Sequence, residues 1–124
     1  MNQQEIFDKV ASHLIAQGKQ SLRTASTVQW GDQSCAYRGD DGTMCAAGCL
    51  IPDEEYKPEF EGRSWTKIQE KIPSLASLAS KESDLIGELQ NLHDSYVDWS
   101  SKDSLKEELH VVACSFNLST DILN

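Results

Sequence analysis

The sequence is poor in aromatic residues and in basic residues, and it has no long apolar run. Aromatic side chains make up only 7% of the 124 residues, so a core must be built mainly from Leu, Ile, Val and Ala. No apolar stretch approaches the roughly 20 residues that a membrane-spanning helix needs, which predicts that the chain does not enter a membrane. Residues 1–8 are polar and acidic and lack the basic and apolar regions of a secretion signal. These absences predict a cytoplasmic protein.

Positive charge is also scarce, because 11 Lys and Arg residues stand against 20 Asp and Glu residues, for a formal net charge of −9. Proteins that bind nucleic-acid backbones or anionic membranes gain affinity from cations, so this balance disfavours both kinds of partner. The acidity fits a basic protein partner, a cation, or solubility alone. The apolar fraction of 39% and the charged fraction of 25% are ordinary for a globular protein. A chain of this length is expected to form a single domain, residues 1–124.

Apolar residues recur at helical spacing in three parts of the chain. The predicted main helices cover residues 6–18, 82–97 and 104–116. Gly18 stands where a glycine commonly ends a helix, and Ser104 and Glu107 have the spacing of a capping box. Shorter helical turns are expected at residues 52–56 and 64–71.

The segment 34–49 is typical of a β-hairpin. Residues 34–38 and 43–47 have the composition of short strands, and the Gly and Asp residues of 39–42 favour a turn between them. Residues 27–30 have strand propensity and would supply a third strand. The fold class predicted is therefore α+β: a mostly helical single domain with one small antiparallel β-hairpin or three-stranded sheet around residues 27–49.

The four cysteines have no close C-x2-C pair, which structural zinc sites usually contain. A zinc site would need Cys35, Cys45 and Cys49, with His93 or Cys114 brought in by folding to complete the set. The alternatives are that the cysteines are small buried residues beneath the hairpin, or that Cys35 and Cys45 form a redox pair. Burial is the interpretation adopted, and no cofactor is predicted.

Evidence for an enzyme is weak in the sequence. A cysteine nucleophile needs a base beside it, and the candidates are Cys45 or Cys49 with His13, His93 or His110. No local signature of a thiol hydrolase, phosphate loop, dinucleotide site, zincin or catalytic serine is present. His93 and Asp94 are adjacent on a predicted helix, where neighbouring side chains point in different directions, so Asp94 is not expected to orient His93. The sequence therefore favours a protein that is not an enzyme.

Acidic residues gather at the predicted turn and in the segment that follows it. The run Asp40-Asp41-Gly42 lacks the regular ligand spacing of a calcium loop, so turn formation explains it. Tyr37 and Arg38 are residue types favoured at interfaces, although on an edge strand they can equally pack against the fold. The expected contact residues are Tyr37, Arg38, Asp40, Asp41, Asp53, Glu54, Glu55, Glu59 and Glu61.

The run from Cys35 to Tyr56 resembles the signature C-x-Y-R-x-x-D-G-x-x-C-A-x-G-C-L-I-P-D-E-x-Y of a family of small uncharacterised proteins from tailed bacteriophages and prophages. The resemblance extends to the helix before it and to the later motif L-Q-x-x-H-D at Leu89–Asp94, and it spans most of residues 3–96. This chain departs from the family by a longer segment at 19–33. The resemblance implies an accessory protein of the bacterial host cytoplasm that binds and inhibits or sequesters a host protein, as in counter-defence. A homo-oligomer of this chain is a further possible assembly.

Overall fold

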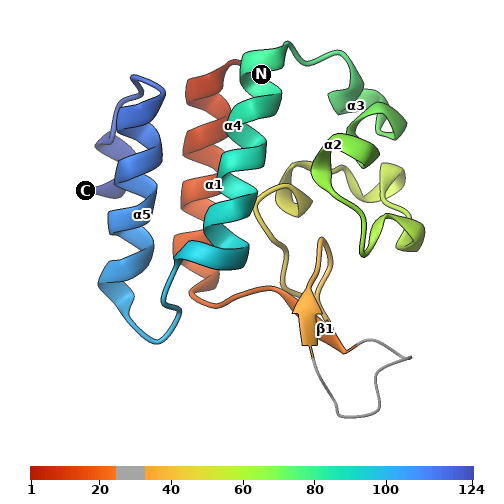
Figure 1. The fold of residues 1–124 in the computed structure, drawn as a ribbon, viewed down its shortest axis with the longest axis horizontal. Helices are drawn as coiled ribbons and strands as arrows, with labels where there is room; N and C mark the ends of the chain where they lie inside the picture. Colours follow the sequence, from red (N-terminus) through yellow and green to blue (C-terminus); the bar gives the residue numbers. More distant parts are fainter. Residues whose placement is uncertain (25–32) are drawn as a thin grey trace.

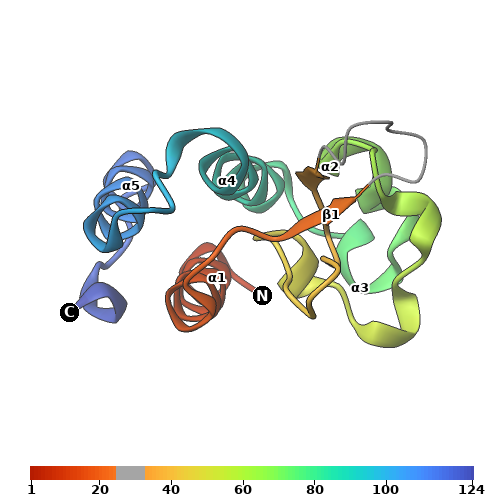
Figure 2. The same ribbon diagram turned by 90° about the horizontal axis from the view of Figure 1, so that it is seen from below.

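The computed structural model describes residues 1–24 and 33–124, and three long helices form its main body. These are α1 (Gln3–Gln17), α4 (Ser80–Asn91) and α5 (Lys102–Ser115). Figure 1 shows them side by side, and Figure 2, which looks along their axes, shows that they form a three-helix bundle. Each helix contacts the other two. The apolar residues predicted for the helical faces, including Phe7, Leu89 and Leu109, are fully buried between them.

Helix α1 forms where the sequence predicted a helix, and both of its ends are capped. The side chain of Asn2 accepts the N–H of Glu5 at 2.8 Å, and the Glu5 carboxylate accepts the N–H of Asn2 at 3.0 Å. This reciprocal arrangement satisfies two backbone donors that the first turn leaves without a partner. Gly18 ends the helix with a φ of +70°, a conformation that L side chains adopt only with strain. The prediction for this helix is confirmed.

The second and third predicted helices are present, with different ends. Helix α4 stops at Asn91 and continues as one π-helical turn, η5 (Leu92–Tyr96), so it is not α-helical to residue 97. Helix α5 starts at Lys102, and the predicted capping box of Ser104 and Glu107 is wrong because Ser104 already lies inside the helix. The Ser104 hydroxyl instead accepts the N–H of Asp98 at 2.8 Å, in the loop before the helix.

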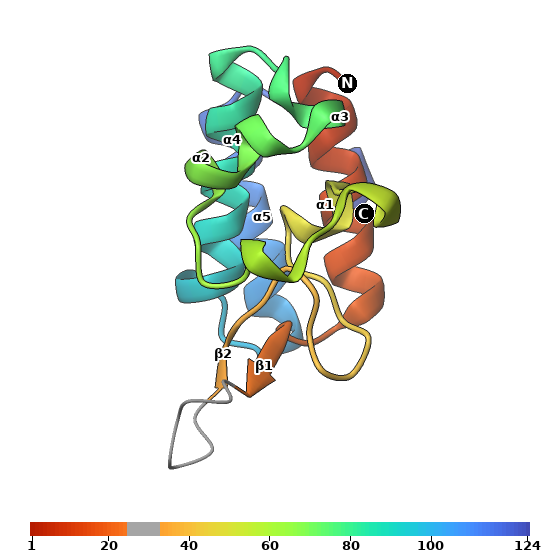
Figure 3. The same ribbon diagram turned by 90° about the vertical axis from the view of Figure 1, so that its right-hand side faces the viewer.

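A set of short turns packs against one side of the bundle, as Figure 3 shows from that side. They are the 3-10 turns η1 (Gly48–Leu50), η2 (Asp53–Glu55), η3 (Pro58–Phe60) and η4 (Gln69–Lys71) and the one-turn α-helices α2 (Trp65–Ile68) and α3 (Pro73–Ala76). Phe60, Ile68 and Ile72 are fully buried and join the same core as the bundle. The turns therefore belong to a single hydrophobic core and do not form a separate layer.

The predicted hairpin and three-stranded sheet are wrong. In the described residues, the β structure is one antiparallel pair of three-residue strands, β1 (Leu22–Thr24) and β2 (Gln33–Cys35), together with a single bridge between Arg38 and Met44. Residues 43–47 do not form a strand, and the candidate strand 27–30 lies outside the described residues. The protein is thus mostly helical, and the predicted α+β class does not hold.

Side chains from α1 explain why the segment 43–47 does not become a strand. The backbone N–H of Met44 donates to the side chain of Gln17 at 2.9 Å. Its carbonyl accepts from His13 Nε2 at 2.8 Å and from Gln17 Nε2 at 3.0 Å. Backbone groups that would bond a neighbouring strand are therefore already satisfied by the helix.

The C-terminal segment is bonded to the start of α1. The Gln4 amide accepts the N–H of Ser119 at 2.8 Å and donates to the Ser119 carbonyl at 3.2 Å. The last turn, η6 (Asp121–Leu123), contacts α1 and buries Leu123. Among the described residues, none of the helices combines the length and the apolar character that a bilayer span requires.

Candidate functional site

Tyr37 lies in the core and not at an exposed tip. Its side chain is 6% exposed, and its hydroxyl donates to the carbonyl of Arg63 at 2.5 Å. Burial is the main cause that raises the pKa of the phenol above its usual range. The ring is therefore not available as an interface anchor, contrary to the expectation for this residue.

Arg38 links the segment after β2 to the start of the acidic segment. Its Nη2 donates to the carbonyl of Ile51 at 2.7 Å and lies 3.1 Å from a carboxylate oxygen of Asp53. The guanidinium carbon lies 5.1 Å from the centre of the Tyr56 ring, within the range of a cation–π contact. With its side chain only 20% exposed, Arg38 holds the loop in place more than it offers a free cation.

Glu61 bonds the same segment from the other side. One carboxylate oxygen accepts the N–H of Tyr37 at 2.9 Å, and the other accepts the N–H of Arg38 at 3.0 Å and the hydroxyl of Tyr56 at 2.6 Å. Burial first, and the hydrogen bond to Glu61 second, raise the pKa of the Tyr56 hydroxyl to about 12. The Glu61 carboxylate therefore bonds to the fold itself, although the sequence placed it among the expected contact residues.

The exposed charges of this region belong to residues 53–61, which we call the acidic loop. Asp53, Glu54 and Glu59 have exposed side chains, and that of Asp53 is 96% exposed. Glu55 points inward instead, since its carboxylate accepts the N–H of Ser74 at 2.7 Å and also contacts the Ser74 hydroxyl. The acidic loop thus presents three carboxylates to solvent, while Arg38 and Glu61 fix its two ends.

Asp40 and Asp41 lie at the turn before the acidic loop, and both are exposed. The turn has the predicted form, with the N–H of Gly39 donating to the carbonyl of Thr43 at 2.8 Å and Gly42 at a φ of +80°. Asp41 accepts from Lys19 at 2.5 Å and from the Thr43 hydroxyl at 2.9 Å, and these two bonds lower the pKa of its carboxyl. Asp41 is thus already paired with a cation of this chain.

The cysteines do not converge on one point. Cys45 is fully buried and accepts the N–H of Gly48 at 3.3 Å, while Cys49 is half-buried and donates to the Ala46 carbonyl at 3.1 Å. Burial raises the pKa of the Cys45 thiol strongly and that of Cys49 to about 12. The alternative of a zinc site at Cys35, Cys45, Cys49 and His93 is not assembled, because among the described residues only Cys35 lies with His93 and Asp94.

His93 is fully buried at the π-helical turn, where its ring joins three parts of the chain. Nε2 accepts the N–H of Ser21 at 2.9 Å, and Nδ1 lies 2.7 Å from a carboxylate oxygen of Asp94. The ring also stacks edge-on against Trp99, with 5.4 Å between the centres. Because Nε2 accepts a backbone proton, the ring proton is on Nδ1 and is donated to Asp94. Asp94 therefore does orient His93, contrary to the sequence interpretation.

One potential ligand atom from each of Cys35, His93 and Asp94 lies within 4.8 Å of the other two, which raises the question of a metal. A ligating imidazole must offer a nitrogen lone pair to the ion. The Ser21 N–H occupies the lone pair on Nε2, and Nδ1 carries the proton. The cluster as arranged therefore does not fit a metal unless the Ser21 hydrogen bond breaks.

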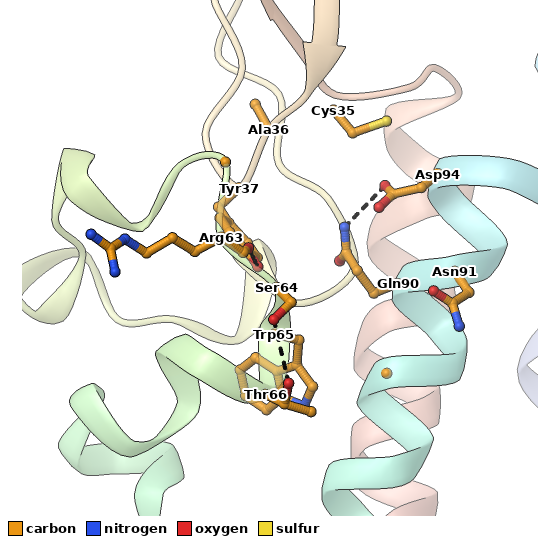
Figure 4. Close-up of a pocket in the computed structure, with 12 residues that line it drawn as sticks. Cys35, Ala36, Tyr37, Arg63, Ser64, Trp65, Thr66, Gln90, Asn91 and Asp94 are labelled. Atoms are coloured by element: carbon orange, nitrogen blue, oxygen red, sulfur yellow. Dashed lines mark hydrogen bonds between the residues drawn. The ribbon is translucent and has the colours of Figure 1, made fainter.

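A cleft of about 450 Å³ opens beside this cluster, between α4 and the segments around Tyr37 and Trp65. Figure 4 shows Gln90, Asn91 and Asp94 on the α4 side, with the Arg63 guanidinium directed away from it. Gln90 donates to Asp94 at 3.0 Å and accepts the N–H of Ala47 at 2.9 Å.

Cys35 lies at one end of this cleft as a protonated thiol. Its sulfur accepts from Gln20 at 3.1 Å. Burial first and the Asp94 carboxylate second raise the pKa of the Cys35 thiol to about 11. Because the thiolate is the reactive form, the raised pKa of Cys35 disfavours this thiol as a nucleophile at neutral pH.

Several residues of the run from Cys35 to Tyr56, and several of Leu89–Asp94, bond to others of the same segment. Arg38 of the Y-R pair reaches Asp53 of the P-D-E run, and Gln90, His93 and Asp94 of L-Q-x-x-H-D form one hydrogen-bonded group. A Cβ on Gly48 would meet the backbone of Tyr37, at 2.9 Å from its carbonyl carbon and still nearer its oxygen. The pattern thus specifies the fold around the cleft, a role that sequence reasoning did not assign to it.

Comparison of the chain with protein-family models, with curated proteins and with solved structures gives no match in any of the three. The fold and the site therefore rest on the residues described above.

Proposed function

We propose that this protein is a non-enzymatic binding protein whose acidic loop docks on a basic surface of a protein partner. The observation that carries the proposal is the exposure of Asp53, Glu54 and Glu59 on a loop that is bonded to the fold at both ends. Their side chains are exposed, while Arg38 and Glu61 bond the loop to the fold behind them. A loop that is already ordered loses little conformational entropy on binding, which favours affinity.

The electrostatics of the whole chain support the same kind of partner. A net charge of −9 attracts a basic surface from a distance and repels nucleic acid. Complementary charge raises the association rate and selects against wrong partners. Binding of this kind weakens as salt is added, because the exposed carboxylates are screened.

The resemblance to phage proteins extends the proposal to the partner's identity. The target is a host protein of the bacterial cytoplasm, and binding inhibits or sequesters it, as in counter-defence. The thiol chemistry supports binding over catalysis, since burial raises the pKa of Cys45 and Cys49, the two candidate nucleophiles.

The test compares two charge-reversed variants with the same change in charge. One carries Asp53→Lys, Glu54→Lys and Glu59→Lys in the acidic loop. The other carries Asp84→Lys, Glu107→Lys and Asp121→Lys at exposed positions on α4, α5 and η6. The wild type and both variants are immobilised, exposed to bacterial lysate and washed with increasing salt, and the retained proteins are quantified by mass spectrometry.

The proposal expects proteins that the wild type and the control variant retain at low salt and that the acidic-loop variant loses. Retention by all three proteins alike, or by none of them, would refute it. Circular dichroism of each variant shows that loss of binding is not loss of fold.

A further inference from the structure

The seam between α4 and α5 is hollowed on the side that α1 does not cover. Figure 2 shows α1 packed against one side of these two helices, with no further long helix on the opposite side. A groove of about 480 Å³ lies along the seam, and none of its described lining residues belongs to α1. We call it the α4–α5 groove, and its main lining residues are Glu88, Tyr96, Glu108, Val111, Val112 and Phe116.

Exposed apolar side chains gather in the α4–α5 groove. The large apolar residues that are exposed in the described part of the chain are Met1, Tyr96, Val111 and Ile122. Two of these line the groove, Tyr96 at 60% exposure and Val111 at 58%. Val112 and Phe116 are less exposed and form its base. Single exposed apolar residues are ordinary, whereas an apolar cluster in a hollow is typical of a binding surface.

The charges that line the groove have one sign. Glu88 lies on α4 and Glu108 on α5, and none of the described lining residues is Lys, Arg or His. Within the part of the chain that the structure describes, neither carboxylate has an ion-pair partner. Two carboxylates without a cation beside an apolar hollow are complementary to an occupant that is apolar in the middle and basic at its edges.

The spacing of the α5 residues in the groove suits a helical occupant. Glu108, Val111, Val112 and Ser115 follow the spacing i, i+3, i+4 and i+7, so they lie along one face of α5. Side chains of another helix can interdigitate with such a face. An extended peptide would gain no backbone pairing here, because the described lining residues belong to no strand.

We propose that the α4–α5 groove binds an amphipathic helix of a partner protein, with the apolar side chains of that helix against Val111 and Phe116 and its Lys or Arg side chains beside Glu88 and Glu108. The net charge of −9 attracts a basic helix and opposes a second copy of this chain. The bound helix becomes the fourth member of the bundle and covers the open side of the seam. The acidic loop lies across the molecule from α5, so this is a separate surface (Figure 2).

The experiment uses the full chain and a fluorescent synthetic peptide of the length of α5, with Leu along one helical face and Lys and Arg beside it. A second peptide has the same composition with its Leu residues distributed around the helix, and a third has Glu in place of each Lys and Arg. Binding is measured by fluorescence anisotropy at low and at physiological salt, and helix formation by circular dichroism. The first peptide is expected to gain helicity on binding, and the other two to bind at least about tenfold more weakly.

A pair of apolar variants locates the peptide on the chain. Val111→Ser removes an apolar side chain from the groove, and Ile122→Ser is its control, because Ile122 is exposed on η6 outside the groove. Val and Ser have similar helix propensities, so the change itself has little effect on α5. Val111→Ser is expected to weaken binding by about fivefold or more at either salt concentration. Ile122→Ser is expected to leave the affinity unchanged.

A pair of charge-reversed variants tests the two carboxylates. Glu88→Lys with Glu108→Lys reverses the charge of the groove. Glu107→Lys with Asp121→Lys makes the same change in net charge at exposed positions outside its lining. The groove variant is expected to bind the peptide at least about fivefold more weakly than its control at low salt, and the difference is expected to shrink as salt screens the charges.

The proposal is overturned if the first peptide does not bind, if the three peptides bind alike, or if either variant has the same affinity as its control. Light scattering of the chain alone gives one more outcome. A dimer that becomes monomeric in Val111→Ser would place a second copy in the groove and also overturn the proposal. None of these measurements uses residues of the acidic loop, so the two proposals can fail independently.

Discussion

Replacing Glu61 by alanine is expected to destabilise the fold far more than any other change to the carboxylates of the acidic loop. Glu61 accepts three hydrogen bonds, from the backbone N–H groups of Tyr37 and Arg38 and from the Tyr56 hydroxyl. The alanine variant leaves both N–H groups without this acceptor at a point where the chain packs against the core. Arg38 would then lose one of the contacts that align it with Asp53.

The size of the effect follows from the number and kind of these bonds. Hydrogen bonds to a charged group contribute about 1.5–3 kcal/mol each. Three such bonds would give an upper limit well above the net effect, because Glu61 is half-buried and water can reach part of the site. A loss of about 3 kcal/mol is therefore expected, which lowers the melting temperature by roughly 10 °C for a chain of this size.

Urea denaturation followed by circular dichroism measures the loss, and Glu59→Ala is the matched control. Glu59 lies two residues away in the same loop, and its side chain is exposed. Among the described residues, its one hydrogen bond to a side chain is made by its backbone carbonyl, which accepts from Arg63. The control is expected to change the free energy of unfolding by less than about 0.5 kcal/mol. Equal stabilities of the two variants would refute the structural role assigned to Glu61.

Two further predictions concern the core and the thiols. Gly48→Ala is expected to lower the free energy of unfolding by at least about 3 kcal/mol or to prevent folding, because its Cβ would overlap the backbone of Tyr37. Gly39→Ala is expected to cost less, because its Cβ would meet mainly side-chain atoms of Thr43 and Ser21, besides the carbonyl of Leu22. Urea denaturation of both variants tests this order. The free energy of unfolding is also expected to fall as pH rises from 9.0 toward 12, since burial raises the pKa of Cys35 to about 11 and of Cys49 to about 12. A pKa raised in the folded state gives stability that is complete below the ordinary value and is lost as the pH passes the folded value. Denaturation curves across this range that show no change would contradict the burial of these thiols.

Helix α1 could be predicted from the sequence because its signals are local. The apolar spacing, the acidic first turn and Gly18 all lie within a few residues of the backbone that they specify. The reciprocal bonds of Asn2 and Glu5 are also a local pattern, although it was not singled out. Each of these signals acts through backbone geometry that one segment determines by itself.

The predicted hairpin failed because the strand partners are not set locally. Residues 33–35 pair with residues 22–24, and Met44 bonds to side chains of α1 that lie 27 and 31 residues earlier. A turn rich in Gly and Asp does form at 39–42, but its flanks find other partners. Strand propensity describes a segment, whereas pairing depends on which backbone groups the rest of the fold leaves free.

The roles of the carboxylates could not be predicted from the sequence either. Glu61 and Glu59 are the same residue type in the same loop. What distinguishes Glu61 is its hydrogen bonds to the backbone 23 and 24 residues earlier and to the Tyr56 hydroxyl. The pairing of His93 with Asp94 was judged impossible on an α-helix, but the chain forms a π-helical turn there, which changes the direction of both side chains. Composition indicates how many charges exist, and three-dimensional contacts decide which of them face solvent.

The hydrogen bonds between Gln4 and Ser119 affect when the protein can finish folding during synthesis. They join positions that are 115 residues apart, and Leu123 packs on α1 close by. Helix α1 leaves the ribosome early, yet the residues that cover this part of it emerge only after α4 and α5. Until then its apolar face is open to other hydrophobic surfaces in the cell, so the nascent chain is most exposed to misassembly before residues 118–123 arrive.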